Sequence, residues 1–227
     1  MSEPIQLYSK EIDADPFPAY QRLRDEFPCY WSESAGIWFL SRYADVASAA
    51  VDWETYSSLS GNLIDEIPGR SGGTLGTTDP PFHDRLRRLA NHAFARKNLA
   101  EVIDHAEAVA RRAVHECAGA DDFDFVSSFS SKVTVATILH MLGLPQQDPA
   151  EIRSKVVLSI STDKASKGRS AEMNDAFAEI SGFLKEAVAM RRREPADDLI
   201  TRLAEAEIDG DALSEREIVL TTAMFVV

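Results

Sequence analysis

Cysteine is scarce in this sequence, and its scarcity excludes two ways of stabilising a small fold. The chain has 227 residues and 2 cysteines, Cys29 and Cys117. Neither has a C-x-x-C partner or a Cys/His cluster beside it, so no disulfide framework and no zinc site is predicted. We expect both to be ordinary buried or half-buried thiols.

Long apolar runs are missing as well. No stretch approaches the roughly 20 apolar residues that a membrane-spanning helix needs. Residues 1–10 also lack the basic region and apolar run of a secretory signal. These absences predict a cytoplasmic protein without a membrane partner.

Basic residues are outnumbered, with 24 Lys and Arg against 37 Asp and Glu and a net charge of −13. Long-range attraction to nucleic acid or to an anionic membrane is therefore disfavoured, and any anion site must be local. A composition of 44% hydrophobic and 27% charged residues is typical of a soluble globular protein, as one large domain or two small ones.

The first 60 residues predict a helix, a hairpin and a second helix. Asp15 and Pro16 are typical of a helix N-terminus, with Asp15 as the N-cap, and apolar residues follow at helical spacing. Residues 29–31 and 37–40 are short aromatic runs that predict two paired strands. A helix over residues 43–50 is expected next.

Residues 61–78 predict a long irregular loop, because five of the 11 glycines fall within residues 61–76. Loops of this length inside a domain are more often functional or mobile than merely connective. The segment lacks a Gly-Lys-Ser/Thr ending, so a phosphate-binding loop is not supported. The plainer alternative is a flexible surface segment.

From Asp79 onward the apolar spacing is helical almost throughout, and Ser214 and Glu217 have the spacing of a capping box that opens a final helix. The predicted class is mainly α with a small N-terminal β-hairpin. The final apolar run, residues 218–227, has no stop signal, so we expect a longer protein cut inside a buried helix. An engineered boundary or an interrupted gene would look the same. The other predicted helices cover residues 80–95, 99–118, 125–142, 172–193 and 197–206.

The densest chemical signal lies on the first of these helices. With Asp79 as N-cap, His83 and Arg87 are one turn apart and about 40° from each other around the axis, on the side of Ala90 and Phe94. One interpretation is that a local carboxylate partners both groups within the fold. The other is a bound dianion, because an imidazole and a guanidinium both donate to carboxylate or phosphate oxygens. The spacing does not decide between them.

The opposite side of the same helix carries Arg85, Arg88 and His92 within about 60° of one another. Charged residues on an outer helix face usually contact only solvent. Spacing alone therefore assigns this face no function.

The segment from Asp79 to Arg87, DPPFHDRLR, resembles the start of the C helix in bacterial cytochromes P450. The usual pattern there is Asp-Pro-Pro, any residue, His, two residues, Leu-Arg. Residues 15–24, 53–58 and 197–227 also resemble that family in order and spacing, so the resemblance spans the whole chain. It implies the N-terminal half of the cytochrome P450 fold, as a single incomplete domain over residues 1–227. Its parts would be a helix and β-hairpin region at 1–60, a mobile substrate-covering loop at 61–78 and a truncated helical part at 79–227.

The resemblance implies heme b as the cofactor, with His83 and Arg87 holding its propionates. The family's acid-and-Thr motif of the I helix, its Glu-x-x-Arg and its heme-binding Cys loop do not occur, and the thiolate ligand is expected downstream of Val227. Neither Cys29 nor Cys117 has the surroundings of that loop. The chain is therefore expected to contain no catalytic residue and no metal ligand.

The resemblance also implies partners and a pocket. A ferredoxin-type electron donor with its reductase would dock on the family's proximal surface, which includes outward residues of this helix. The alternative is that these residues only contact solvent. The substrate-covering loop and the last helix would supply residues that line the substrate pocket. The alternative is that these residues only pack against the rest of the fold. The docking candidates are Arg85, Arg88, Arg96 and Lys97, and the pocket candidates are Leu63, Ile64, Leu75, Met224 and Val227.

Two functions follow from these expectations. The complete protein would be a heme-thiolate monooxygenase that hydroxylates or dealkylates a small or medium-sized organic substrate with O2 and two electrons, while the 227-residue chain alone would be inactive. The alternative is a non-catalytic helical protein of the same fold, in which His83 and Arg87 bind another anion or a partner.

Overall fold

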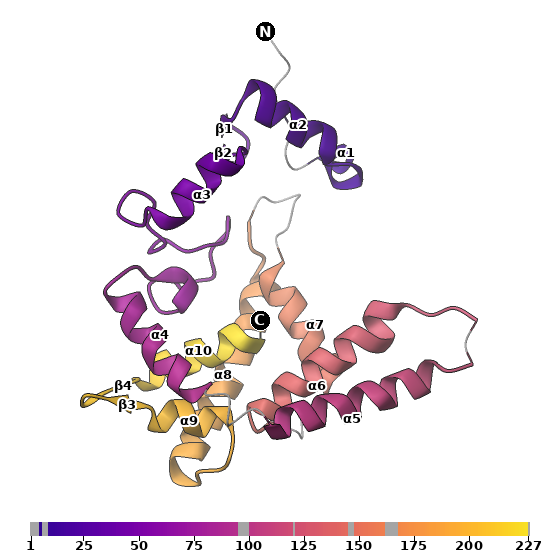
Figure 1. The fold of residues 1–227 in the computed structure, drawn as a ribbon, viewed down its shortest axis with the longest axis vertical. Helices are drawn as coiled ribbons and strands as arrows, with labels where there is room; N and C mark the ends of the chain where they lie inside the picture. The colour runs from indigo at the N-terminus through magenta and orange to yellow at the C-terminus, as the bar shows by residue number, and fades with distance from the viewer. Residues whose placement is uncertain are drawn as a thin grey trace. The chain divides into compact units, whose positions relative to one another are not determined.

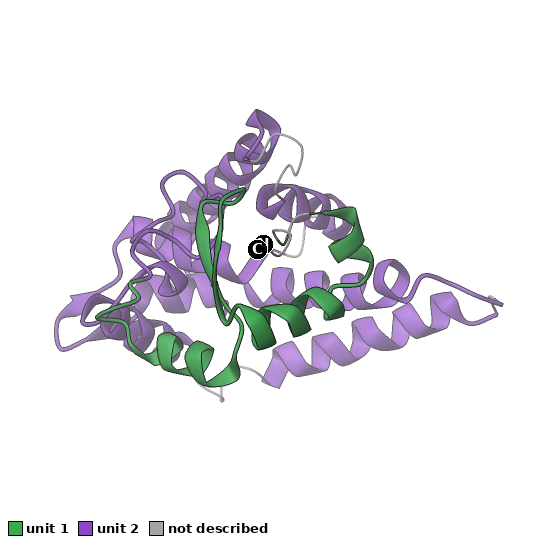
Figure 2. Cartoon of the chain, turned by 90° about the horizontal axis from the view of Figure 1, so that it is seen from above, with its two compact units in different colours: residues 1–57 green, residues 58–227 purple. Residues whose placement is uncertain are grey.

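A computed structural model describes residue 5 and residues 9–94, 100–119, 121–144, 148–161 and 168–226. These residues are mainly helical with two short antiparallel hairpins, which confirms the predicted class. The chain divides into two compact units, residues 1–57 and 58–227 (Figure 2). No helix in the described ranges is long and apolar enough to cross a membrane.

The first unit contains the predicted helix, hairpin and helix, preceded by one short helix that the sequence analysis did not predict. In the hairpin, Trp31 lies opposite Trp38 with ring centroids 5.3 Å apart. Gly36 has a φ of 66° in the connecting turn, a conformation that favours glycine. The elements are α1 (Lys10–Ala14), α2 (Phe17–Glu26), β1 (Cys29–Ser32), β2 (Ile37–Leu40) and α3 (Tyr43–Val51) (Figure 1).

Two predictions within this unit are wrong in detail. Pro16, not Asp15, occupies the N-cap position of α2, and no side chain caps this helix. The Asp15 carboxylate instead accepts a hydrogen bond from the backbone N–H of Phe17 at 3.2 Å. Cys29 is exposed at the start of β1 rather than buried, whereas Cys117 is half-buried as expected.

The second unit contains the remaining elements. The 3-10 turn η1 (Leu75–Thr77) is followed by α4 (Phe82–Ala93), α5 (Ala100–Cys117), the π-helical turn η3 (Val126–Ser130), α6 (Ser131–Met141), α7 (Pro149–Ile160), α8 (Ala171–Arg193), α9 (Leu199–Glu205), β3 (Glu207–Ile208), β4 (Asp211–Ala212) and α10 (Glu215–Val226). In this unit α5 packs on α6, α7 on α8, and α8 on α10.

Three features of the second unit differ from the predictions. The helix expected over 125–142 begins as a π-helical turn before α6. Helix α7 was not predicted, although Asp148 and Pro149 mark its start, and the Asp148 carboxylate accepts from Ala150 N at 2.9 Å. The hairpin of β3 and β4 was also missed, and its turn is Asp209-Gly210, with φ of 56° and 78°, a common two-residue hairpin turn.

The core of the second unit fixes the position of α4. Leu86, Leu89, Ala90 and Ala93 follow helical spacing and belong to one buried cluster with residues of α6, α8, α9 and α10. Leu86 and Leu89 are 1% and 0% exposed, so each contributes about 2 kcal/mol of hydrophobic stabilisation. The remaining faces of α4 are therefore held in a fixed orientation.

The predicted capping box at the start of α10 is confirmed. The hydroxyl of Ser214 accepts from the backbone N–H of Glu217 at 3.3 Å, and the Glu217 carboxylate accepts from the backbone N–H of Ser214 at 2.7 Å. Each side chain thus satisfies a donor that the first turn of a helix leaves open.

Candidate functional site

The segment that enters α4 is built differently from the prediction. The Asp79 side chain does not cap the helix, because Pro81 occupies the N-cap position. One Asp79 carboxylate oxygen accepts from the backbone N–H of Ser58 at 2.9 Å, and the Asp79 carbonyl accepts from His83 N at 2.9 Å. Asp79 therefore ties residue 58 to the start of α4, which begins two residues later than expected.

His83 and Arg87 lie on one side of α4, as the helical spacing predicts. His83 Nδ1 is 3.1 Å from a carboxylate oxygen of its neighbour Asp84, and its side chain is 24% exposed. Arg87 is exposed and has no hydrogen-bond or ion-pair partner among the residues that the structure describes. A local carboxylate thus partners His83 in part and leaves Arg87 available for an anion.

Arg85 has the opposite surroundings. Its guanidinium donates to Asp211 from Nε at 2.8 Å and from Nη2 at 2.8 Å, to the Ala212 carbonyl at 2.8 Å, and to Glu217 at 2.6 Å. Bidentate pairing with Asp211 links α4 to β4, and a single hydrogen bond to Glu217 links α4 to α10. The arginine is an internal anchor, which disfavours the docking role expected of it.

The same contacts shift three pKa values. Hydrogen bonds to Asp211 and Glu217 raise the pKa of Arg85 against the effect of burial, and those from Arg85 lower the pKa of Asp211. Burial alone would raise the pKa of Glu217, but hydrogen bonds from Ser214 and Arg85 outweigh it and lower that pKa. All three groups are held in their charged forms.

The outer face of α4 is only partly described. Arg88 and His92 are exposed, as expected of this face. Arg96 and Lys97 lie outside the described residues. Among the predicted docking residues that the structure describes, Arg88 is therefore the one that is exposed and could contact a partner.

The loop between the units' boundary and α4 is organised around the carboxylate of Glu66. Its oxygens accept from the backbone N–H groups of Asn62 and Ile67 at 2.9 Å each, and from Arg70 Nε at 2.7 Å. Arg70 also donates to the side-chain oxygen of Asn62. Gly61 is required here, because its φ is 113° and an added Cβ would lie 2.0 Å from a Glu66 oxygen.

The electrostatics of this cluster favour charged Glu66. Burial alone would raise the pKa of Glu66, but the hydrogen bonds from Arg70, Ile67 and Asn62 outweigh it and lower the pKa below its usual range. The Glu66 and Arg70 side chains are 16% and 15% exposed. The sequence analysis missed this pair, although a Glu and an Arg four residues apart were a visible signal. The mobility predicted for the loop stays a prediction.

A largely apolar cavity of about 310 Å³ lies between this loop and helices α7, α8 and α10. Leu63 and Met224, two of the predicted pocket residues, line it together. Ile64 is 55% exposed and Leu75 packs against the core cluster, and neither lines this cavity; Val227 lies outside the described residues. Its wall consists of Asn62, Leu63, Ile67, Arg70, Thr74, Ile160, Phe177, Leu220, Ala223 and Met224.

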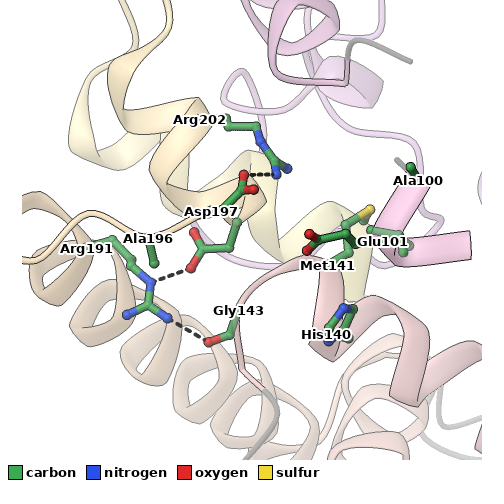
Figure 3. A pocket seen from close by; sticks show the side chains of 11 residues that line it. Ala100, Glu101, His140, Met141, Gly143, Arg191, Ala196, Asp197 and Arg202 are labelled. Carbon is green, nitrogen blue, oxygen red and sulfur yellow. Dashed lines mark hydrogen bonds and ion pairs between the residues drawn. The ribbon is translucent and has the colours of Figure 1, made fainter. Parts of the chain in front are cut away.

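A second, more polar pocket of about 420 Å³ lies among α5, α6, α8 and α9 (Figure 3). Its two arginines already have acceptors: Arg191 pairs with Asp198 and with the Gly143 carbonyl, and Arg202 pairs with Asp197. Because these guanidinium groups already have acceptors, this pocket offers an incoming anion less than the open side of α4 does. Within the described ranges, no group of three or more His, Cys, Asp or Glu residues could hold a metal ion.

Comparisons with known proteins place this helical fold in one class of protein. The chain is related in sequence and in fold to the N-terminal half of bacterial cytochromes P450, which are heme monooxygenases. It is 29% identical over 224 residues to putative cytochrome P450 123 of Mycobacterium tuberculosis, covering 97% of this chain and 56% of that protein. It is 30% identical over 198 residues to the erythromycin C-12 hydroxylase of Saccharopolyspora erythraea, covering 86% of this chain and 49% of that protein.

Solved structures give the same result. Cytochrome P450 CYP109Q5 from Chondromyces apiculatus matches with a TM-score of 0.82 at 22% identity, over 98% of this chain and 56% of that one. Cytochrome P450 TbtJ1, without ligand, matches with a TM-score of 0.76 at 28% identity, over 99% of this chain and 57% of that one. No family model matches the sequence. The chain spans about half the length of the curated relatives it matches.

The residues present fit the propionate edge of a heme. Two heme carboxylates need donors without competing internal acceptors, and Arg87 meets this condition among the described residues. His83 shares one ring nitrogen with Asp84 and keeps Nε2 for a second contact. This agreement between the residues and the cofactor concerns only the propionate edge of the heme.

Proposed function

We propose that this chain forms the N-terminal half of a heme-thiolate monooxygenase. The observation that carries the proposal is the position of Arg87. It lies without a partner in the described structure, one turn from His83, within a segment that resembles the C helix of bacterial cytochromes P450. When bound, the heme would supply oxygen activation through an iron whose thiolate ligand lies outside this chain.

The residues of this chain would bind and orient the cofactor and the substrate, and none of them would take part in the bond-breaking step. Arg87 and His83 would hold the two propionates by charge-assisted hydrogen bonds. The Arg85 anchor would keep α4 from turning, because it joins this helix to β4 and α10 on the side away from His83 and Arg87. The 227-residue chain alone would be inactive.

The cavity between the loop and helices α7, α8 and α10 would hold a small or medium-sized organic substrate. Its wall is mainly apolar, with Phe177 and Met224 among the lining side chains. The Glu66–Arg70 pair would hold the loop in place over this cavity. Leu63 would contact the substrate from the loop and Met224 from α10.

A ferredoxin-type donor with its reductase would supply the electrons, which requires a setting such as the cytoplasm. Arg88 would face the acidic surface of that donor. Because this chain carries a net charge of −13, a local basic group such as Arg88 would favour the approach of an acidic partner.

Heme incorporation tests the proposal. The gene is read beyond the codon for Val227 and the complete product is expressed with a heme precursor. We expect one heme per chain and the carbon monoxide difference spectrum of a thiolate-bound heme. A product that takes up no heme, with the fold intact by circular dichroism, would favour the non-catalytic alternative.

A further inference from the structure

The polar residues that line the apolar cavity all come from the loop before α4. Asn62, Arg70 and Thr74 contribute to its wall, whereas helices α7, α8 and α10 contribute only apolar residues. A molecule in the cavity therefore meets hydrogen-bonding groups on the loop side alone. The groups that remain available to it depend on the hydrogen bonds that these three residues already make.

Arg70 keeps one nitrogen free. Its Nε donates to one Glu66 carboxylate oxygen at 2.7 Å, and its Nη2 donates to the other at 2.8 Å and to the side-chain oxygen of Asn62. Nη1 has no hydrogen-bond partner among the residues that the structure describes, and it is not fully buried. Because the guanidinium is planar and turns its Nε–Nη2 edge to Glu66, Nη1 points away from that carboxylate.

The other two polar residues favour a ligand that accepts hydrogen bonds. The side-chain oxygen of Asn62 already accepts from Arg70, which leaves the Asn62 amide N–H groups as donors. The Thr74 hydroxyl is 2.9 Å from the hydroxyl of Thr77, and Thr74 is 2% exposed. The loop thus offers N–H donors to the cavity, and an oxygen acceptor on the ligand is the group that can use them.

The charges around Arg70 distinguish between a neutral and an anionic acceptor. Glu66 and Arg70 form an ion pair without net charge. The neighbouring Asp65 and Arg169 add one charge of each sign. A carboxylate in the cavity would bring a further charge that no free cation balances, which is costly away from water. A neutral carbonyl oxygen would still accept a charge-assisted hydrogen bond from the guanidinium.

We propose that Arg70 determines substrate specificity by donating a hydrogen bond from Nη1 to a neutral carbonyl oxygen of an otherwise apolar molecule in this cavity. The favoured ligands are then apolar ketones and esters rather than hydrocarbons or carboxylic acids. The proposal rests on the cavity being the substrate site of the proposed monooxygenase. It adds a substrate class and gives Arg70 a role besides holding the loop.

The test compares propiophenone with propylbenzene, which have the same carbon skeleton and differ by the carbonyl oxygen. Both are titrated into the complete protein at pH 7.5 by isothermal titration calorimetry, and the ratio of the two affinities is measured. Arg70→Lys keeps a positive charge for Glu66 but lacks Nη1. In this variant propiophenone affinity should fall about tenfold relative to propylbenzene affinity, which should change little.

A second variant guards against loss of the loop structure. Glu66→Gln combined with Arg70→Gln removes both charges together, so that neither is left unpaired. It should lose the relative affinity for propiophenone as Arg70→Lys does. A merely structural Arg70 would weaken both ligands by the same factor in these variants.

Infrared difference spectra of propiophenone with an isotope-labelled carbonyl report the hydrogen bond itself. A charged donor lowers the stretching frequency of the carbonyl, so the frequency of the bound ligand should rise in the double variant. A structural role of Arg70 would not change this frequency.

Arg216→Gln is the matched control. Arg216 Nη2 donates to the Gly69 carbonyl of the same loop at 2.9 Å, but Arg216 does not line the cavity. Its substitution should change both affinities by the same factor and leave the affinity ratio and the carbonyl frequency as they are.

An affinity ratio that is the same in the unsubstituted protein and in both Arg70 variants would overturn the proposal. Tighter binding of hydrocinnamate, an acid with the same number of carbons, than of propiophenone would overturn it as well. Heme content of the same samples tests the proposed function separately. A ketone preference that depends on Arg70 in a protein without heme would refute the monooxygenase and support Arg70, and heme without that preference would do the reverse.

Discussion

Arg85 and Arg87 are two residues apart on α4 and have opposite surroundings. Arg85 donates hydrogen bonds to Asp211, Glu217 and a backbone carbonyl, whereas Arg87 has no partner in the described part of the chain. The side of the helix decides this difference, since both carry the same guanidinium. Substitution of Arg85 should therefore affect the stability of the fold, and substitution of Arg87 should affect heme binding.

Arg87→Ala should weaken heme retention and leave the fold intact. Loss of one charge-assisted hydrogen bond to a propionate should speed heme loss about tenfold. The measurement is the heme-to-protein ratio after gel filtration, with far-ultraviolet circular dichroism as the check on folding. Arg88→Ala, an exposed neighbour on the other side of α4, is the matched control. Equal heme content in both variants would remove Arg87 from the anchoring role.

Arg88→Glu should slow reduction by an acidic ferredoxin. Reversing an exposed charge reduces the association rate most at low salt, and the difference should shrink as screening increases. Stopped-flow reduction at several ionic strengths measures this effect. Arg111→Glu, on the 77% exposed Arg111 side chain of α5, serves as control. Rates that match those of the unsubstituted protein at every ionic strength would leave Arg88 as a solvated residue.

At the scale of elements, the loop before α4 depends on a single carboxylate. Glu66 receives backbone N–H groups from both directions along the loop and the guanidinium of Arg70. Repeated glycines gave the loop's extent in the sequence analysis but not its internal structure. The conformation of the loop is held by the hydrogen bonds of Glu66, which lies between those glycines in the sequence.

Glu66→Gln should destabilise the protein by about 3 kcal/mol, because it leaves the largely buried Arg70 without its charged partner. Chemical denaturation measures the free energy of unfolding. Asp65→Asn is the control, since it neutralises the adjacent carboxylate, which makes no hydrogen bond in this cluster. A loss no larger than that of the control would show that the backbone alone holds the loop.

The sequence predicted the elements whose signals are local. Regular apolar spacing located α5, α8 and α10, and Ser214 with Glu217 predicted a real capping box. Helix α7 and the short hairpin were missed because their signals, Asp148-Pro149 and Asp209-Gly210, are only two residues long. Asp79 was misassigned because a donor to its carboxylate, the backbone N–H of Ser58, is 21 residues away.

The candidate site was predictable only on its helical side. Spacing placed His83 and Arg87 on one stripe, because a helix fixes relative directions over one turn. The internal partners of Arg85 are 126 and 132 residues away in sequence, so no local pattern revealed them.

For the whole molecule, the paired carboxylates predict a stability that falls in acid. The pKa values of Glu66, Glu217 and Asp211 are lowered in the folded state. Their ionised forms therefore stabilise the fold fully above the unfolded pKa values of 4.5 for Glu and 3.8 for Asp, and this stabilisation is lost as the pH falls through the lowered values.

The expected result is a decrease in the free energy of unfolding from about pH 5 downward, measured by urea denaturation at successive pH values. Glu66→Gln should have a shallower pH dependence over this range. Burial and the adjacent His140 also lower the pKa of His105, so that neutral His105 favours the fold and a smaller loss begins as the pH falls through 6.5. Stability independent of pH from 7 to 3 would contradict both expectations.

The Arg85 anchor has a consequence for how the protein is made. A ribosome that has just added Arg85 must add 126 more residues to supply Asp211 and 132 to supply Glu217. At about 5–20 residues per second, this interval is on the order of 10 s. Throughout it the helix that carries the proposed heme anchors is synthesised but not yet locked. A cofactor arriving during synthesis would therefore meet α4 before its final orientation is fixed.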